Sequence, residues 1–144
     1  MKLLKITFLS MLISVLSMLS FAQTSPKNMT SQEINQKVDL QLKEVFGEYY
    51  SMYIEGKPDQ LEFYSNFYKR CEYLSIDNAP EGIDNISILE LLEKYNPNVI
   101  VHDNISVFDE TKFNILKYRF DYYNNTDRYF RIYNTNVVLK INKL

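Results

Sequence analysis

Cysteine, histidine, glycine and tryptophan are scarce or absent in this chain of 144 residues, which has one Cys, one His, three Gly and no Trp. The single cysteine, Cys71, excludes an internal disulfide, the usual staple of small exported proteins. Glycine occurs only at Gly47, Gly56 and Gly82. The sequence therefore contains neither the glycine-rich phosphate-binding loop nor the dinucleotide-binding fingerprint. The chain therefore lacks the common nucleotide-binding motifs.

The lone histidine limits the chemistry further. A zinc site needs three or four ligands close together, and His102 lies far along the chain from Cys71. In a strand, Asp103 would point away from the face that carries His102, and no catalytic triad is indicated. We favour a hydrogen-bonded structural histidine, with acid–base catalysis by His102 and a distant carboxylate as an alternative. We expect no catalytic residues, no cofactor and no metal.

The first 22 residues have the pattern of a signal peptide. Lys2 and Lys5 precede an apolar run over residues 6–19, and Ser20 and Ala22 place small side chains at the two positions that a signal peptidase recognises. The run is short for a bilayer core of roughly 30 Å, and no stop-transfer segment follows. We predict cleavage after Ala22 and export to the periplasm or the extracellular space, without stable membrane insertion. No Cys follows the cleavage site for a lipid anchor, and the lack of disulfides favours a bacterial envelope.

Charge is divided unevenly along the rest of the chain. After a polar lead-in over residues 23–30, residues 31–144 have the size of a single domain. Residues 31–111 hold six basic and sixteen acidic residues, whereas residues 112–144 hold seven basic and two acidic ones. We favour two halves that turn their charges to solvent and attract each other weakly. The alternative is a basic surface for an acidic partner.

The first helix is predicted over residues 31–55, where apolar residues recur at spacings of three and four. Thr30 and Glu33 have the spacing of a capping box, so the helix should begin at Ser31. Gly56 can adopt the left-handed conformation that ends a helix.

A second helix is predicted to begin at Pro58, which the first turn of a helix tolerates. Its apolar stripe continues to Leu74 and includes Cys71, which we expect to be a buried helix residue, with a reactive thiol or an intermolecular bridge as the alternative. A loop over residues 77–84 separates it from a third helix over residues 87–97.

After residue 97 the apolar period changes from helical to two, which indicates strands over residues 99–102, 105–108, 113–123, 128–133 and 137–141. In the longest segment, alternation places Leu116, Tyr118, Phe120 and Tyr122 on one face and Lys117, Arg119 and Asp121 on the other. Helices followed by strands predict an α+β fold with three N-terminal helices packed on a C-terminal antiparallel sheet of about four strands.

Acidic and basic clusters have ordinary explanations. The loop over residues 77–84 lacks the alternating ligands of a calcium loop, and neighbouring carboxylates are typical of solvated surfaces. The basic half interleaves Lys and Arg with Tyr, as proteins that bind single-stranded nucleic acid do. Export and the negative net charge argue against nucleic acid as a partner, so we predict none.

Residues 49–64 read YYSMYIEGKPDQLEFY, an aromatic helix end, a Gly turn and a second helix that opens with Leu and an aromatic residue. This junction resembles that of the nuclear transport factor 2-like, or cone-fold, superfamily, and so does the order of helices followed by strands. Lys57 stands where the family usually has Asp, and the Trp of its last strands is missing. The Asp and His pair of its enzymatic members is not found either.

The resemblance implies an apolar pocket between helices and sheet. The candidates to line it are Tyr49, Tyr53, Tyr64, Phe67, Tyr118, Phe120 and Tyr122. The alternative is that these side chains are plain core. We predict a non-enzymatic exported binding module that holds a small apolar ligand or an envelope protein. The alternative is a periplasmic inhibitor or immunity-type protein that acts through protein–protein contact.

Overall fold

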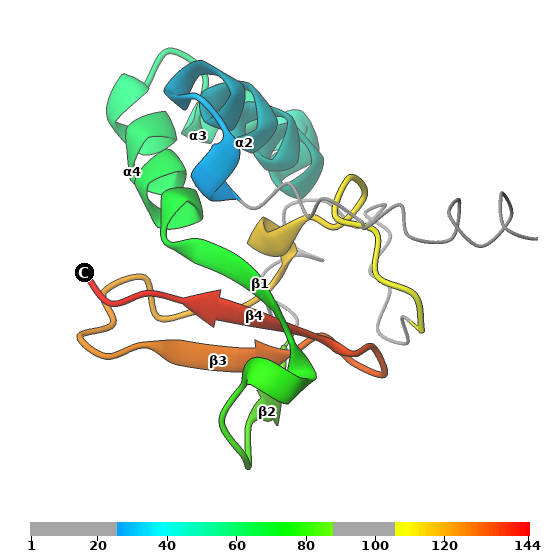
Figure 1. Cartoon of the computed structure of the whole chain (residues 1–144). Helices are drawn as coiled ribbons and strands as arrows, with labels where there is room; N and C mark the ends of the chain where they lie inside the picture. Colours follow the sequence, from blue (N-terminus) through cyan, green and yellow to red (C-terminus); the bar gives the residue numbers. More distant parts are fainter. Residues whose placement is uncertain (1–25, 88–105) are drawn as a thin grey trace, which may run out of the picture.

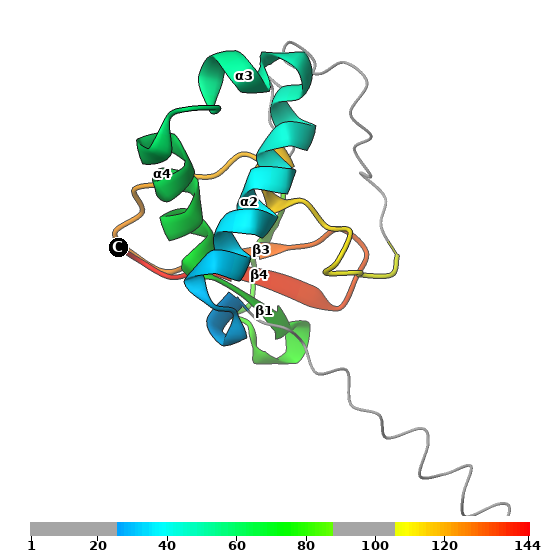
Figure 2. The same ribbon diagram turned by 90° about the horizontal axis from the view of Figure 1, so that it is seen from above.

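A computed structural model describes residues 26–87 and 106–144. A layer of helices lies on one side of a small sheet, with η4 and the chain around it close to both (Figures 1 and 2). The α-helices are α2 (Ser31–Phe46), α3 (Tyr50–Tyr53) and α4 (Pro58–Lys69). The strands are β1 (Cys71–Ser75), β2 (Asp84–Asn85), β3 (Arg128–Arg131) and β4 (Val137–Ile141). Short 3-10 turns are η1 (Pro26–Asn28), η2 (Gly47–Tyr49), η3 (Ile76–Asn78) and η4 (Ile115–Lys117).

The start of α2 confirms the predicted capping box. The Thr30 hydroxyl accepts a hydrogen bond from the Glu33 amide at 3.3 Å, and the Glu33 carboxylate accepts one from the Thr30 amide at 2.7 Å. The prediction of one helix to residue 55 is wrong in its second half. Gly47, with φ 52°, ends α2, and the chain turns through η2 into the short helix α3.

The second helix begins at Pro58 as predicted, after Gly56 with φ 71°, but it ends at Lys69. Residues 71–75 form β1 instead of the last helical turn, because they pair along their whole length with β4. Cys71 and Tyr73 point into the core with the period of a strand. Cys71 is therefore buried, as expected, although it lies in a strand.

The sheet has the order β1-β4-β3-β2. β4 is antiparallel to both β1 and β3, so it lies between them, whereas β2 runs parallel to β3 through two residue pairs. The predicted strands over residues 128–133 and 137–141 are confirmed in their cores. The prediction of a purely antiparallel, C-terminal sheet is wrong, because β1 and β2 come from the first half of the chain and β2 joins in parallel.

Residues 113–123 do not form the predicted strand. The Asn114 side chain accepts a hydrogen bond from the Leu116 amide and donates one to the Gln41 carbonyl, both at 3.0 Å, which favours the turn η4. Alternating burial is nevertheless present from residue 118 to 122. Lys117, predicted on the solvent side, is 7% exposed and forms an ion pair with Glu44 of α2.

Several predictions fall outside the described residues. These are the signal peptide over residues 1–22, nearly all of the third helix over residues 87–97, and the strand over residues 99–102 with His102. Among the helices that the structure does describe, none combines the length and the apolar character that crossing a membrane requires.

The core joins the two layers. The faces of α2 and α4 that meet each other also meet η4 and the inner side of β1 and β4. Its members with the least exposure are Val38, Leu42, Tyr68, Cys71, Ile115, Ile132 and Leu139.

Candidate functional site

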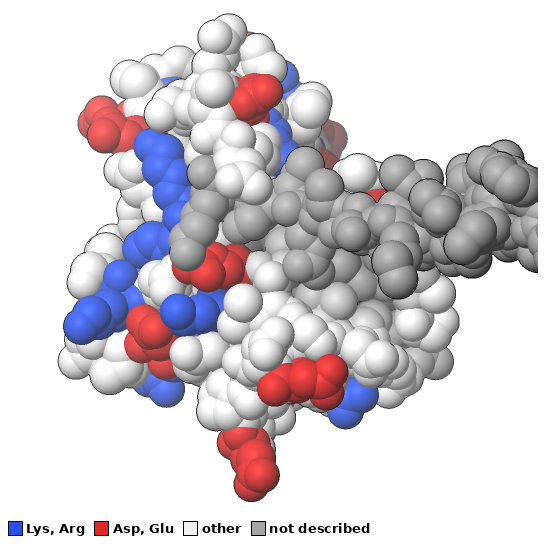
Figure 3. All heavy atoms as spheres, viewed as in Figure 1, with Lys and Arg blue, Asp and Glu red and all other residues white. Residues whose placement is uncertain are grey.

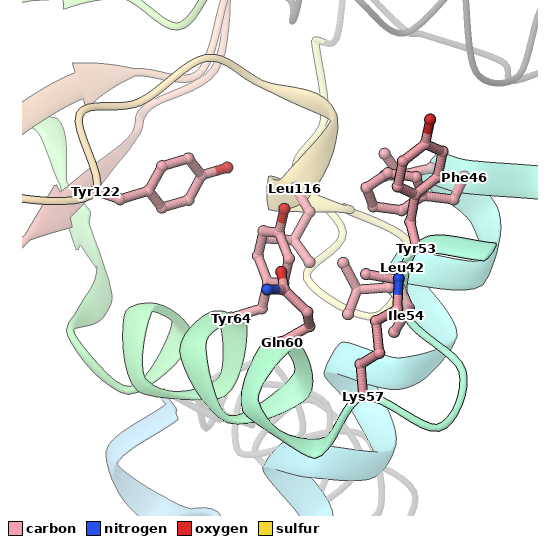
Figure 4. Close-up of a pocket in the computed structure, with 10 residues that line it drawn as sticks. Leu42, Phe46, Tyr53, Ile54, Lys57, Gln60, Tyr64, Leu116 and Tyr122 are labelled. Carbon is pink, nitrogen blue, oxygen red and sulfur yellow. The ribbon is translucent and has the colours of Figure 1, made fainter. Parts of the chain in front are cut away.

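A pocket of about 420 Å³ opens among the helices, where the end of α2, the turn after α3 and the start of α4 face the segment that follows η4 (Figure 4). Most of its wall is apolar or aromatic. The lining residues are Leu42, Val45, Phe46, Tyr53, Ile54, Lys57, Gln60, Tyr64, Leu116 and Tyr122. We call this feature the aromatic pocket.

Two glycine turns shape the first wall of the aromatic pocket. The break at Gly47 redirects the chain through η2 into α3, which lies across the end of α2 (Figure 2), and the Tyr53 ring lies 5.7 Å from the Phe46 ring. Ile54 is buried beneath this turn, and Gly56 in the left-handed region leads into α4. The first wall is thus made from a single stretch of chain that turns sharply twice.

The opposite wall consists of Tyr64 on α4 and Tyr122 from the loop before β3. Their rings lie 6.0 Å apart and almost perpendicular, an arrangement that aromatic rings favour. Phe67 supports the Tyr122 ring from behind at 4.7 Å. Arg70 donates a hydrogen bond to the Tyr122 carbonyl, which fixes the backbone from which this ring extends.

Polar groups interrupt the wall at three places. The Lys57 ammonium donates to the Met52 carbonyl and lies 5.9 Å from the centre of the Tyr53 ring. Gln60 lies one turn further along α4 (Figure 4). Burial, with the neighbouring Tyr64, raises the pKa of Tyr122, so this hydroxyl stays protonated at neutral pH.

The structure divides the seven residues that the sequence nominated. Tyr53, Tyr64 and Tyr122 come together in the lining of the aromatic pocket. Phe67, Tyr118 and Phe120 lie in the core, where the Phe67 and Phe120 rings pack 5.6 Å apart. Tyr49 is 36% exposed; its ring lies 6.4 Å from that of Tyr53 and outside the lining.

Several lining residues were not nominated. Leu42, Val45 and Phe46 belong to the apolar stripe of the first helix, so periodicity alone marked them as core. Ile54, Lys57 and Gln60 take part only because α3 lies across the end of α2, and the break at Gly47 was the signal that could have revealed this. The pocket also lies among helices and a loop, not between helices and sheet as the family resemblance implies.

A second group of titratable side chains lies on the other side of α2. The Lys37 ammonium donates to the Glu110 carbonyl at 3.3 Å and lies 5.7 Å from the centre of the Tyr68 ring. Burial lowers the pKa of Lys37 and raises that of Glu110. The Tyr68 hydroxyl and one Glu110 oxygen are buried, and no residue that the structure describes forms a hydrogen bond with either. One carboxylate and one lysine held in this way indicate a packing contact between α2 and the chain before η4.

The remaining nucleophile of the described residues, the thiol of Cys71, lies in the core. Cys71 is fully buried, donates to the Phe67 carbonyl at 3.5 Å, and has a pKa raised by burial, so it is not an activated thiol. Within residues 26–87 and 106–144, no group of three or more His, Cys, Asp or Glu could hold a metal ion.

No protein-family model, curated protein or solved structure matches this chain. The geometry of the aromatic pocket is therefore the basis for the function that follows.

Proposed function

We propose that this chain is an exported, non-enzymatic binding module of the bacterial envelope, and that the aromatic pocket holds a small, largely apolar ligand. The observation that carries the proposal is the pocket itself. Its volume of about 420 Å³ falls within the range of about 300–1,000 Å³ typical of small-molecule sites. Its wall combines apolar and aromatic side chains with a few polar groups, the composition that such sites share.

The supports of the pocket favour a preformed site. Tyr122 is held at its backbone by Arg70 and at its ring by Phe67, and Ile54 anchors the turn on the opposite side. A wall fixed before binding loses little conformational freedom when the ligand enters, which favours affinity. Two parts of the proposal rest on the sequence alone. These are the export of the protein and its membership of the cone-fold superfamily.

A dye titration tests the proposal. We expect the protein, expressed as the full chain and purified from the envelope of its host, to bind the neutral fluorescent probe N-phenylnaphthylamine saturably, with one site per chain. Gln60→Trp would fill the pocket, so it should weaken binding at least about tenfold. Gln36→Trp makes the same change at an exposed position of α2 and should leave binding unchanged.

Two results would contradict this function. One is the lack of saturable binding by the wild-type protein. The other is equal weakening of probe binding by Gln60→Trp and Gln36→Trp. If a change outside the aromatic pocket weakens binding as much as a change inside it, the probe does not occupy the pocket.

A protein–protein function is the second candidate, and an exposed tyrosine beside a half-buried phenylalanine favours it. Tyr123 is 72% exposed, and its ring lies 5.9 Å from that of Phe63 on α4. Aromatic side chains are enriched at protein interfaces. An envelope partner recovered at low salt by the wild-type protein and lost with Tyr123→Ala would support an inhibitor or immunity-type role. Recovery that Tyr123→Ala leaves intact would count against this surface.

A further inference from the structure

The charge of the aromatic pocket is one-sided. Lys57 is the one charged residue among the ten that line it, whereas the acidic residues nearest in sequence, Glu55 and Asp59, do not belong to the lining. Lys57 is exposed at the edge of the pocket, so its ammonium is accessible to a ligand that enters from solvent. The pocket should therefore distinguish ligands by the sign of their charge.

The pocket also holds hydrogen-bond donors that the protein does not use. The Lys57 ammonium has three protons, and the Met52 carbonyl accepts one of them. The Gln60 amide and the Tyr122 hydroxyl form no side-chain hydrogen bond with any residue that the structure describes. Lys57 and Gln60 both come from the start of α4, and the Tyr122 hydroxyl points toward the pocket from the far side (Figure 4).

From these two observations we propose that the ligand is an amphipathic organic anion, with one carboxylate or sulfonate head on an apolar body. The head lies at Lys57 and Gln60, where an ammonium and an amide can both donate to its oxygens. The body lies between Tyr53 and Leu42 on one side and Tyr64 and Tyr122 on the other. This inference rests on the proposed function, and it adds the chemical class of the ligand.

The acidic character of the chain as a whole makes the inference specific. Sixteen acidic residues in the segment 31–111 repel an anion at long range, and the mixed basic and acidic side chains of the face in Figure 3 give no single strong field. Selection for an anion must then come from contacts within the pocket. A general attraction of anionic dyes to a basic protein would not explain a preference for an anion, because this chain has a negative net charge.

Two probes that differ by one charged group provide the test. Anilinonaphthalene sulfonate is N-phenylnaphthylamine with a sulfonate added, so the ratio of their dissociation constants measures the preference for the anion. We expect the wild-type protein to bind the sulfonate about fivefold to tenfold more tightly than the neutral probe, as one charge-assisted contact would give. Lys57→Met should remove this preference, so that the ratio of the two dissociation constants falls to about one.

Two further variants make the result specific to Lys57. Lys57→Arg keeps the charge and should keep the preference for the sulfonate. Lys69→Gln removes an exposed cation from the far end of the same helix and should have no effect on the ratio. Circular dichroism should confirm that each variant is folded, because the sulfonate probe also binds partly unfolded chains.

The outcomes separate the two proposals. Equal binding of both probes, or a preference that Lys57→Met leaves intact, would overturn the anion proposal while the binding function stands. Saturable binding of neither probe would overturn the binding function, and with it the anion proposal.

Discussion

The thiol of Cys71 is surrounded by the core between α4 and β4. It has no exposed surface, and its burial raises the pKa of the thiol well above its ordinary range. The thiolate, which is the reactive form, is therefore neither populated nor accessible in the folded protein.

We accordingly expect a thiol-specific reagent at neutral pH to leave the native protein unmodified and to modify one thiol per chain after denaturation. Mass spectrometry before and after denaturation measures both values. Rapid modification of the native protein would mean that Cys71 is accessible, in favour of the reactive-thiol alternative.

Asp127 connects the loop before β3 with the end of β4. Its carboxylate accepts a hydrogen bond from the Lys143 amide at 3.0 Å and forms an ion pair with Lys140 at 3.3 Å. These contacts, the backbone hydrogen bond first, lower the pKa of Asp127. A lowered carboxyl pKa stabilises the fold above the pKa of the unfolded chain, and this contribution is lost as pH falls through the folded pKa.

Asp127→Asn should therefore be less stable than the wild-type protein at pH 7. The difference should shrink once the pH falls below about 4, where the wild-type carboxyl also becomes protonated. Thermal unfolding at several pH values measures it. A difference that grows toward acidic pH would contradict this role for the carboxylate.

The turn before α4 places one residue where a side chain is costly. Gly56 has φ 71°, a conformation that residues with a β-carbon rarely adopt, although the space around it is open. Gly56→Ala should lower the free energy of unfolding by about 1 kcal/mol through backbone strain alone. It should also weaken binding in a dye titration with the sulfonate probe, because the same turn presents Lys57 to the aromatic pocket.

Urea unfolding measures the loss of stability, and the dye titration measures the loss of binding. An alanine variant as stable as the wild-type protein would show that the turn is free to rearrange. Unchanged binding in a destabilised variant would separate this turn from the pocket.

Local sequence signals were sufficient to predict those elements whose conformation is determined by residues within or next to the element. The capping box at Thr30, the proline at the start of α4 and the short apolar segment over residues 137–141 all predicted what the structure shows. Residues 71–75 and 113–123 were predicted wrongly because distant residues determine their conformation. β1 depends on pairing with β4, and η4 depends on the side chain of Asn114 and its contact with Gln41.

The lining of the aromatic pocket was likewise only partly predictable from the sequence. Tyr53, Tyr64 and Tyr122 were nominated because the family resemblance implies an apolar pocket lined by aromatic side chains of the helices and strands. Periodicity could not show that Phe67 and Phe120 turn to the core, since both positions lie on the same apolar stripes as the lining residues. That distinction depends on where α3 lies.

Arg70 holds together three parts of the whole molecule. Its guanidinium donates to the Tyr122 carbonyl, to the Asn124 side chain at 3.1 Å and to the Asn142 carbonyl at 3.2 Å. It thereby joins the end of α4, the loop that carries Tyr122 and the chain after β4. Hydrogen bonds from a charged donor stabilise more than neutral ones.

Arg70→Met keeps the aliphatic part of the side chain and loses these donors. We expect it to lower the free energy of unfolding by about 2 kcal/mol, and to weaken probe binding because Tyr122 loses its anchor. Arg128→Met, at an exposed position of β3, is the matched control and should change neither. Equal effects of the two variants in urea unfolding would argue against Arg70 as an anchor.

Export is a prediction about the whole chain. When the complete sequence is expressed in a bacterial host, we expect the protein in the envelope or medium to begin at Gln23, with residues 1–22 removed. Intact mass spectrometry of the purified protein measures this. Full-length protein confined to the cytoplasm would contradict the signal peptide.

The position of β4 has a consequence for biogenesis. β4 pairs with both β1 and β3, yet it is the last of the described strands to leave the ribosome. The bond between Arg70 and Asn142 closes 72 residues of chain, and contacts at such separations form slowly. Until residues 137–141 are available, β1 has no partner and the helices have no sheet to cover. If the chain is exported as we propose, this order would keep it from completing its fold until its last strand has crossed the membrane.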